Sequence, residues 1–213
     1  MEKTASERPV GRRESNKQDR RQAIIEAARR AFLDDGYAAT SMSGLLKTLG
    51  GSKATLWSYF RSKEELFAAV IEDLTSAFSA ELEGGLQKPA DLERTLSVFC
   101  ACFMETTALP DTVAAWRLIV GESGRFPELG RIFYEQAAMR IETALANYLR
   151  DQVAAGRLRD ENTVRMAQTL IGFCANRQNK RLWGVEPTDE DGVDADAVRF
   201  TRYFLRLFET DRS

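Results

Sequence analysis

Apolar residues recur along this chain at spacings of three and four, whereas almost no segment alternates apolar and polar residues with a period of two. A spacing of three and four places side chains on one face of an α-helix. Only 5 of the 213 residues are proline, so few positions interrupt such helices. The pattern therefore predicts an all-α fold, and hydrophobic residues, at 44% of the chain, are numerous enough for a buried core.

Glycine, proline and capping residues mark the expected helix boundaries. Four helices are predicted in the first part, over about 17–34, 41–49, 52–59 and 62–83, with Gly84-Gly85 ending the fourth. Longer helices are expected after Pro89, after Pro110, over about 128–155 and 162–183, and after an acidic loop at 186–196. We expect two domains, residues 1–62 and residues 63–213.

Charge is unevenly distributed along the chain. Residues 1–70 carry 13 Lys and Arg against 9 Asp and Glu, whereas residues 71–213 carry 17 against 23, and the net charge is −2. A basic end on an acidic body predicts an anionic partner for the basic end alone.

Histidine is absent from the sequence. Its absence excludes Ser-His and Cys-His catalysis, histidine-based zinc sites and a histidine pH switch. The sequence also lacks a glycine motif that cradles phosphate and a carboxylate pair in an apolar context. We therefore predict a protein that is not an enzyme and that has no metal and no cofactor.

The setting of the protein is indicated by its apolar runs and its cysteines. No apolar run is long enough to span a membrane, and the polar stretch 1–21 lacks the apolar segment of a secretory signal. Cys100, Cys102 and Cys174 lie in apolar contexts, so the sequence favours buried thiols over a thiol sensor. These observations predict a cytoplasmic protein without a membrane partner.

Two short predicted helices, 41–49 and 52–59, are joined by Gly50-Gly51, which is the arrangement of a helix-turn-helix. The second helix of that motif enters the DNA major groove, where hydroxyl and ammonium groups contact base edges and phosphates. A small residue lets the helix approach the groove closely. The side chains expected there are Ser52, Lys53, Ala54 and Thr55.

Side chains further along the second helix are expected to divide between core and DNA. Leu56 and Phe60, four residues apart, are expected in the core of the motif. The flanking polar groups are candidates for phosphate contacts, and they belong to Trp57, Tyr59, Arg61 and Lys63. An alternative left open is that Trp57 and Tyr59 are ordinary core aromatics.

The run GYAATSMSGLLKTLGGSKATLWSYFRSKEELFAAVI resembles the N-terminal domain of the TetR/AcrR family of transcription repressors. The family pattern contains Thr-Ser, a leucine-rich helix, Ala-Gly-Val-Ser-Lys-Gly-Thr-Leu-Tyr-x-Tyr-Phe and Ser-Lys-Glu-x-Leu, at the same spacing. The resemblance implies phosphate contacts by Ser41 and Trp57, groove contacts by Lys53, Ala54 and Thr55, and further DNA contacts by Tyr59 and Lys63. The sequence departs from the family pattern at three positions: Gly51 replaces valine, Ala54 replaces glycine and Trp57 replaces tyrosine. These departures concern which operator sequence is recognised, and not the DNA-binding role.

The stretch before the first predicted helix carries several cations. They are Arg8, Arg12, Arg13, Lys17, Arg20 and Arg21. These side chains are expected either to reach a phosphate or the minor groove, or to belong to a solvated tail. Arg20 and Arg21 already fall within the predicted helix, so backbone contacts are favoured for them.

The same resemblance implies that the C-terminal domain binds a small effector and dimerises through its last two helices. The stretch WRLIVGESGRFPELGRIFYEQ is similar to a subset of family C-terminal domains. Large apolar and polar residues of the middle helices are candidates for an effector pocket. They are Phe99, Phe103, Met104, Trp116, Arg117, Glu122, Phe173 and Asn176.

The last two predicted helices each carry an apolar stripe, and we expect these to pair with a second copy in a four-helix interface. The stripe residues are Val164, Ala167, Ile171, Cys174, Phe200, Phe204 and Phe208. The alternative is that both stripes serve only the core of one subunit.

These observations predict a homodimeric repressor that binds double-stranded operator DNA and is released by a partly apolar effector. A regulator without an effector, or an activator, remains open within the same class. A helical adaptor that docks an acidic protein, or a helical enzyme for a small hydrophobic substrate, are alternatives of other classes.

Overall fold

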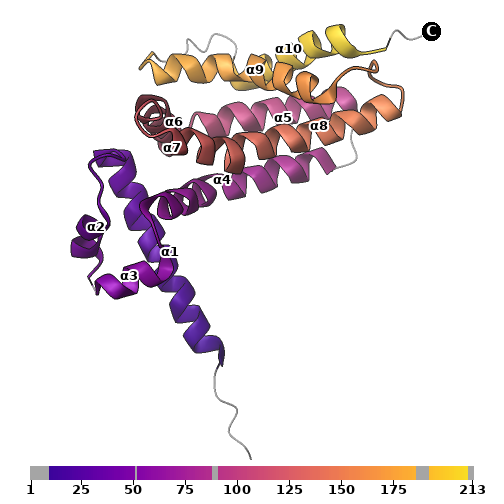
Figure 1. Cartoon of the computed structure of the whole chain (residues 1–213). Helices are drawn as coiled ribbons and strands as arrows, with labels where there is room; N and C mark the ends of the chain where they lie inside the picture. Colours follow the sequence, from indigo (N-terminus) through magenta and orange to yellow (C-terminus); the bar gives the residue numbers. More distant parts are fainter. Residues whose placement is uncertain (1–9, 51, 88–90, 186–191, 211–213) are drawn as a thin grey trace, which may run out of the picture. The chain divides into compact units, whose positions relative to one another are not determined.

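The computed structural model describes residues 10–50, 52–87, 91–185 and 192–210, and it is helical over most of them. The chain divides into two compact units, Met1–Val70 and Ile71–Ser213. Figure 1 labels the α-helices, which are α1 (Val10–Asp35), α2 (Met42–Leu49), α3 (Lys53–Tyr59), α4 (Lys63–Gln87), α5 (Leu92–Thr107), α6 (Pro110–Glu122), α7 (Pro127–Phe133), α8 (Met139–Ala154), α9 (Thr163–Leu182) and α10 (Gly192–Phe208). A π-helix, η1 (Tyr134–Ala138), lies between α7 and α8. The all-α prediction is confirmed.

An aromatic cluster organises the N-terminal unit. The rings of Phe32, Tyr37 and Phe67 lie 5.4 to 5.5 Å apart in edge-on and stacked pairs, and all three are buried. Phe32 closes the inner face of α1, and Phe67 comes from the second turn of α4. The start of α4 therefore packs with the N-terminal unit, and the units divide at Val70 rather than at the expected residue 62.

Capping side chains begin the two helices of the predicted helix-turn-helix. The hydroxyl of Ser41 accepts a hydrogen bond from the Gly44 N–H at 3.0 Å, and that of Ser52 accepts one from the Thr55 N–H at 3.1 Å. Such caps satisfy the free N–H groups at a helix start. Gly50 ends α2 with a φ of 65°, a conformation that side chains with a Cβ rarely adopt. Both short helices were predicted, with Ser52 as the cap of the second and either Thr40 or Ser41 as the cap of the first.

Three helix boundaries differ from the expected ones. Helix α1 begins at Val10, a turn or more before the predicted start. Helix α4 continues through Gly84 and Gly85, and neither glycine has a positive φ. Helix α10 begins at Gly192, so the second half of the expected acidic loop is helical. Residues 186–191 of that loop lie outside the described residues.

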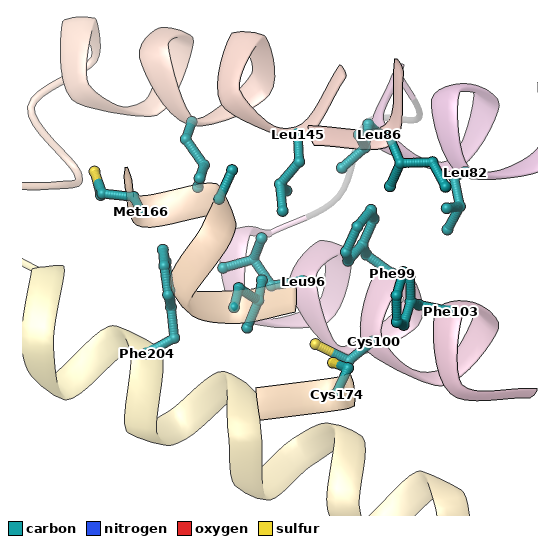
Figure 2. Close-up of a cluster of buried hydrophobic side chains, with 14 of the residues drawn as sticks. Leu82, Leu86, Leu96, Phe99, Cys100, Phe103, Leu145, Met166, Cys174 and Phe204 are labelled. Atoms are coloured by element: carbon teal, nitrogen blue, oxygen red, sulfur yellow. The ribbon is translucent and has the colours of Figure 1, made fainter. Parts of the chain in front are cut away.

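The core of the C-terminal unit joins five helices. Figure 2 shows Leu82 and Leu86 of α4 meeting Phe99 of α5 and Leu145 of α8. The remaining walls come from α9 and α10, through buried residues that include Met166, Cys174 and Phe204. This one cluster uses the inner face of every long helix in the unit.

A buried ion pair joins the last two helices. Arg177 of α9 donates to the carboxylate of Asp196 on α10, and both residues are less than 9% exposed. Arg199, one turn along α10, also donates to Asp196. A buried carboxylate needs such partners, because an unpaired charge is costly away from water.

The segment Pro127–Ala154 was expected to be one uninterrupted α-helix. It contains a π-helix instead, in which the Met139 N–H donates to the Tyr134 carbonyl, five residues back. A π-turn accommodates one extra residue and is found mostly as a single turn within an α-helix.

The helices of the described parts of the chain are too short or too polar to cross a membrane.

Candidate functional site

The first turn of α3 presents its side chains to solvent. Lys53, Ala54 and Thr55 are exposed, whereas Leu56 and Phe60 are each 1% exposed. The two apolar residues therefore fix the helix to the core of the N-terminal unit, as predicted. The opposite face remains open over the full first turn, which is the arrangement that groove recognition requires.

The two serines predicted to contact DNA also hold the local structure. Ser41 Oγ lies 3.0 Å from the Gly44 nitrogen, and Ser52 Oγ shares a 2.8 Å hydrogen bond with Thr55 Oγ1. Both serines are exposed. A hydroxyl has one donor and two acceptor positions, so a capping serine keeps capacity for a phosphate.

Arg20 of α1 supports the turn between α2 and α3. Its Nη2 donates to the main-chain oxygen of Gly50 at 2.7 Å and to that of Leu49 at 3.3 Å. These are among the last carbonyls of α2, which lack partners within the helix. Arg20 was predicted to contact DNA, and this role was not predicted because a spacing of 30 residues leaves no local pattern in the sequence.

The four residues predicted further along α3 and after it as phosphate contacts differ in exposure, and Arg61 is exposed. Trp57 is 38% exposed and Tyr59 is half-buried, so neither belongs fully to the core. The ammonium of Lys63 donates to the Tyr37 carbonyl and lies 4.0 Å from the centre of the Tyr37 ring. Lys63 therefore joins α4 to the end of α1, which differs from the expected outward phosphate clamp.

The cations before and within α1 are placed only in part. Lys17 is exposed, and the Arg21 guanidinium lies 5.2 Å from the centre of the Phe60 ring. Arg8 lies outside the described residues, and the side chains of Arg12 and Arg13 are likewise not described. These last two positions are helical, whereas they were expected to lie before the first helix.

The eight residues predicted for an effector pocket have different surroundings in the C-terminal unit. Phe99, Phe103 and Met104 belong to the closed core of the C-terminal unit. Trp116 packs edge-on against Phe133 at 4.7 Å. Phe173 pairs with Phe200 at 6.2 Å, Glu122 is half-buried, and Asn176 is exposed.

Arg117, also predicted for the effector pocket, makes hydrogen bonds within the subunit. Its Nη2 and Nε donate to the main-chain oxygens of Arg181 and Leu182, at 2.7 and 3.2 Å. These are the last carbonyls of α9, so Arg117 joins α6 to the end of α9. A guanidinium is well suited to two adjacent oxygens because its donors form a planar fork.

The predicted dimer residues fall into two groups. Ala167, Cys174 and Phe204 are each fully buried in the subunit's own core, where they offer no surface to a second copy. Ile171, Phe200 and Phe208 are half-buried, and Val164 is 40% exposed. The expected interface therefore narrows to the outer faces of α9 and α10, which also expose Tyr203 and Leu207. An apolar helix stripe does not reveal from sequence alone which partner covers it.

The cysteines are buried or half-buried thiols. Burial raises the pKa of the Cys102 thiol to about 11. A hydrogen bond with Cys100, together with burial, raises the pKa of Cys174, and Figure 2 shows the two sulfur atoms side by side. Protonated thiols are poor nucleophiles, so the favoured interpretation as packing residues agrees with their surroundings.

The N-terminal unit is basic and contains a helix-turn-helix, and a second helical unit follows it. This combination is typical of a two-domain transcriptional regulator. The pattern of the family described as bacterial regulatory proteins, tetR family, matches residues 24–70. The C-terminal domain of AefR-like transcriptional repressors matches residues 94–210. The chain therefore belongs to the TetR family, whose members are DNA-binding transcriptional regulators and not enzymes.

Similar proteins agree with this assignment. The chain is 33% identical to the HTH-type transcriptional regulator BetI of Rhizobium meliloti over 114 residues, or 53% of this chain and 56% of BetI. It is 30% identical to the HTH-type transcriptional repressor ComR of Escherichia coli over 53% of this chain and 54% of ComR. The matched region thus spans about half the length of these curated relatives.

Solved structures extend the likeness over nearly the whole chain. The flavonoid-responsive regulator FrrA is 30% identical and has a TM-score of 0.77, with 92% of this chain and 100% of FrrA covered. A Mesorhizobium loti protein assigned to the TetR family has a TM-score of 0.79 at 23% identity, covering 91% of this chain and 98% of that one. The second likeness concerns the fold alone.

Proposed function

We propose that this protein is a homodimeric transcriptional repressor that binds operator DNA through α3 and is released by a small effector. The observation that carries the proposal is the open first turn of α3, where Lys53, Ala54 and Thr55 are exposed above a buried Leu56. The DNA-binding set is Ser41, Ser52, Lys53, Ala54, Thr55, Trp57 and Tyr59. Lys63, which was predicted to contact DNA, is assigned here to the attachment of α4 to Tyr37.

The two rival classes are less consistent with this surface. A protein adaptor would need only a basic face, whereas α3 combines a small residue, a hydroxyl and an ammonium at the positions that face a groove. The family assignment also favours a regulator.

A gel shift with the DNA upstream of the protein's own gene tests the proposal. We expect salt-sensitive, sequence-dependent binding, because neutralised phosphates release counterions. Lys53→Ala should weaken binding about tenfold or more. Lys180→Ala is the control, because Lys180 is an exposed lysine on α9 of the C-terminal unit and should not change the affinity. Equal binding by wild type and Lys53→Ala would contradict the assignment of α3.

The proposed dimer uses the outer faces of α9 and α10. Tyr203 is 46% exposed and Leu207 is 50% exposed on α10, and Val164 adds an exposed apolar side chain on α9. Dimerisation would cover these side chains, and two recognition helices in a dimer reach successive turns of the major groove. The protein would act in the cytoplasm, where its DNA is found.

Light scattering tests the dimer directly. The chain has a mass of 24.0 kDa, so the wild type should scatter as twice that mass. Tyr203→Asp combined with Leu207→Asp should give the single-chain mass, because two carboxylates would be desolvated at the interface. Val120→Asp is the control, since Val120 is an exposed apolar residue on α6. A wild type with the single-chain mass would refute the dimer.

The effector is proposed to be a small and partly apolar molecule that binds the C-terminal unit. FrrA, which is described as flavonoid-responsive, has the same fold over almost its whole length. By analogy, binding in the C-terminal unit would favour a conformation with lower affinity for the operator. Addition of a flavonoid to the gel shift should release the DNA if this chain responds to the same chemical class.

A further inference from the structure

Two hydroxyl groups meet at the start of α3. Ser52 Oγ lies 2.8 Å from Thr55 Oγ1, and either atom can be the donor of this hydrogen bond. Ser52 Oγ also accepts the N–H of Thr55 at 3.1 Å. Both side chains are exposed, so the pair lies on the surface assigned to DNA and not in the core. The direction of the bond between the hydroxyls decides what Thr55 offers to a base.

The hydroxyl of Thr55 has a different kind of partner from those of several threonines further along their helices. In the latter, the hydroxyl donates to the main-chain oxygen four residues back, at 2.8 to 3.0 Å, and examples are Thr75, Thr95, Thr107 and Thr169. Such a bond uses the one proton of the hydroxyl within the helix. Thr55 lies in the first turn of α3 and is paired with a second hydroxyl instead. The use of its proton therefore depends on Ser52.

The pair has two arrangements, because each hydroxyl has one proton and two lone pairs. In the first, Thr55 donates to Ser52, whose lone pairs are then both occupied and whose own proton is free. Thr55 Oγ1 is left with lone pairs alone and can only accept. In the second, Ser52 donates to Thr55, and the proton of Thr55 is free to be donated to a base.

Duplex DNA favours the first arrangement. The DNA backbone presents acceptors, above all the phosphate oxygens, so a serine that contacts it must donate its proton. Ser52 belongs to the proposed DNA-binding set. A hydrogen bond to an anionic phosphate is stronger than one between two neutral hydroxyls. The proton of Ser52 therefore goes to the phosphate, and the proton of Thr55 goes to Ser52.

We propose that Thr55 is a specificity-determining residue, and that it accepts a hydrogen bond from the exocyclic amino group of an adenine or a cytosine in the major groove. The inference rests on the proposed function, since it characterises the base that α3 reads. Adenine and cytosine present amino donors there, whereas guanine and thymine present the acceptors O6 and O4. A hydroxyl that only accepts therefore disfavours guanine and thymine at the base that it faces.

The groups next to Thr55 do not compete for that amino group. Ser58 Oγ donates to the main-chain oxygen of Thr55 at 2.7 Å, so this oxygen is already bonded. Ala54 has no polar side-chain atom, and the ammonium of Lys53 can only donate. Among the side chains of the first turn of α3, which are all described, Thr55 alone offers an acceptor.

The test measures a ratio of affinities for different bases. Operator duplexes are varied one base pair at a time, and the Kd of the full-length protein for each is measured by fluorescence anisotropy. At one position the wild type should bind adenine or cytosine about tenfold more tightly than guanine or thymine. Replacing that adenine by purine, or that cytosine by pyrimidin-2-one, removes only the amino group and should cost the same factor.

Substitutions of Thr55 identify the base position. Thr55→Val removes the hydroxyl and keeps the shape of the side chain, so at that position the variant should bind all four bases within about twofold. Thr55→Ser is the matched control, because it keeps the hydroxyl that pairs with Ser52. This variant should keep the preference for adenine or cytosine at the same position.

Two substitutions of Ser52 test the direction of the bond. Ser52→Asp keeps an acceptor for the N–H and the hydroxyl of Thr55, so the preference should remain although repulsion from the phosphate weakens binding to every duplex. Ser52→Gly preserves the helix start at little cost but frees the proton of Thr55. Guanine and thymine should then be bound about as tightly as adenine and cytosine. Circular dichroism checks that both variants are folded.

The contrary outcomes are distinct from a failure of the proposed function. A wild type that prefers guanine or thymine at the position identified by Thr55→Val would overturn the inference, and so would a preference that Ser52→Gly leaves intact. If Thr55→Val changes no base preference at any position, the inference is also wrong, while operator binding that Lys53→Ala weakens would still support the repressor. Only a wild type without sequence-dependent binding would contradict both.

Discussion

The guanidinium of Arg20, in α1, donates to the main-chain oxygen of Gly50 at 2.7 Å, across 30 positions of the sequence. Gly50 ends α2, and its neighbour Gly51 stands where the TetR/AcrR pattern has valine. A small hollow of about 10 Å³ lies beside Gly50, lined in part by Ile24 and Leu49. Arg20 joins the turn to α1 by hydrogen bonds.

Arg20→Ala should weaken operator binding about tenfold while leaving the salt dependence of binding unchanged. The reason is that Arg20 positions α3 through the turn, so its loss removes no phosphate contact, and each phosphate contact adds about one to the slope of log K against log salt. A titration at several salt concentrations measures both quantities. A slope that falls by about one would instead identify Arg20 as a phosphate contact. Arg20→Lys should bind the operator more tightly than Arg20→Ala but less tightly than the wild type, because an ammonium lacks the planar donors of a guanidinium.

Gly50→Ala should destabilise the N-terminal unit by about 1 kcal/mol, because a φ of 65° is unfavourable for a residue with a Cβ. No atom lies within 4 Å of the added Cβ, so strain and not a clash is the cause. Gly84→Ala is the opposite control. Gly84 is an exposed interior residue of α4, and alanine there should stabilise by up to about 1 kcal/mol. Urea denaturation measures both, and equal signs would contradict the prediction.

Asp196→Ala should be among the most destabilising changes in the C-terminal unit. It leaves the Arg177 guanidinium buried without its carboxylate, at a cost of about 3 to 5 kcal/mol. Replacing both residues, with Arg177→Met and Asp196→Leu, should recover most of that loss because no buried charge remains. Thermal or urea unfolding of the single and double variants gives the coupling. Additive losses would show that the two charges do not interact.

Cys102 should react slowly with iodoacetamide at neutral pH. Burial raises the pKa of its thiol to about 11, and only the thiolate is nucleophilic. Because the acid form is favoured, the thiolate fraction at pH 8 is about one in a thousand, and the rate should rise about tenfold per pH unit up to that pKa. Mass spectrometry of the folded protein follows the modification. Rapid labelling at pH 7 would support the thiol-sensor alternative.

Local chemistry made the helix-turn-helix predictable. The caps were predictable because a hydroxyl before an apolar period satisfies nearby N–H groups, which indicated Ser52 and one of Thr40 and Ser41. The glycine pair Gly50-Gly51 indicated the tight turn between the helices. Leu56 and Phe60 were assigned to the core because they lie four residues apart on one face. These features depend on residues close together in the sequence.

Contacts between distant residues were beyond the reach of the pattern. Phe204 and Cys174 lie on apolar stripes, but their burial in the subunit's own core depends on how α5, α9 and α10 pack. Arg20, Lys63 and Arg117 were assigned to ligands, whereas each donates to a carbonyl far along the chain. The sequence around a Lys or Arg does not indicate which oxygen its long, flexible side chain will contact in the folded protein.

The π-turn at Tyr134–Ala138 holds one residue more than an α-helical turn would hold. The additional residue can be taken up one position earlier or later by exchanging a five-residue hydrogen bond for a four-residue one, without unwinding the segment. Such a shift would rotate the side chains of α8 together about the helix axis. Deleting one residue from the π-turn should convert it to ordinary α-helix and leave α8 with a single rotational setting.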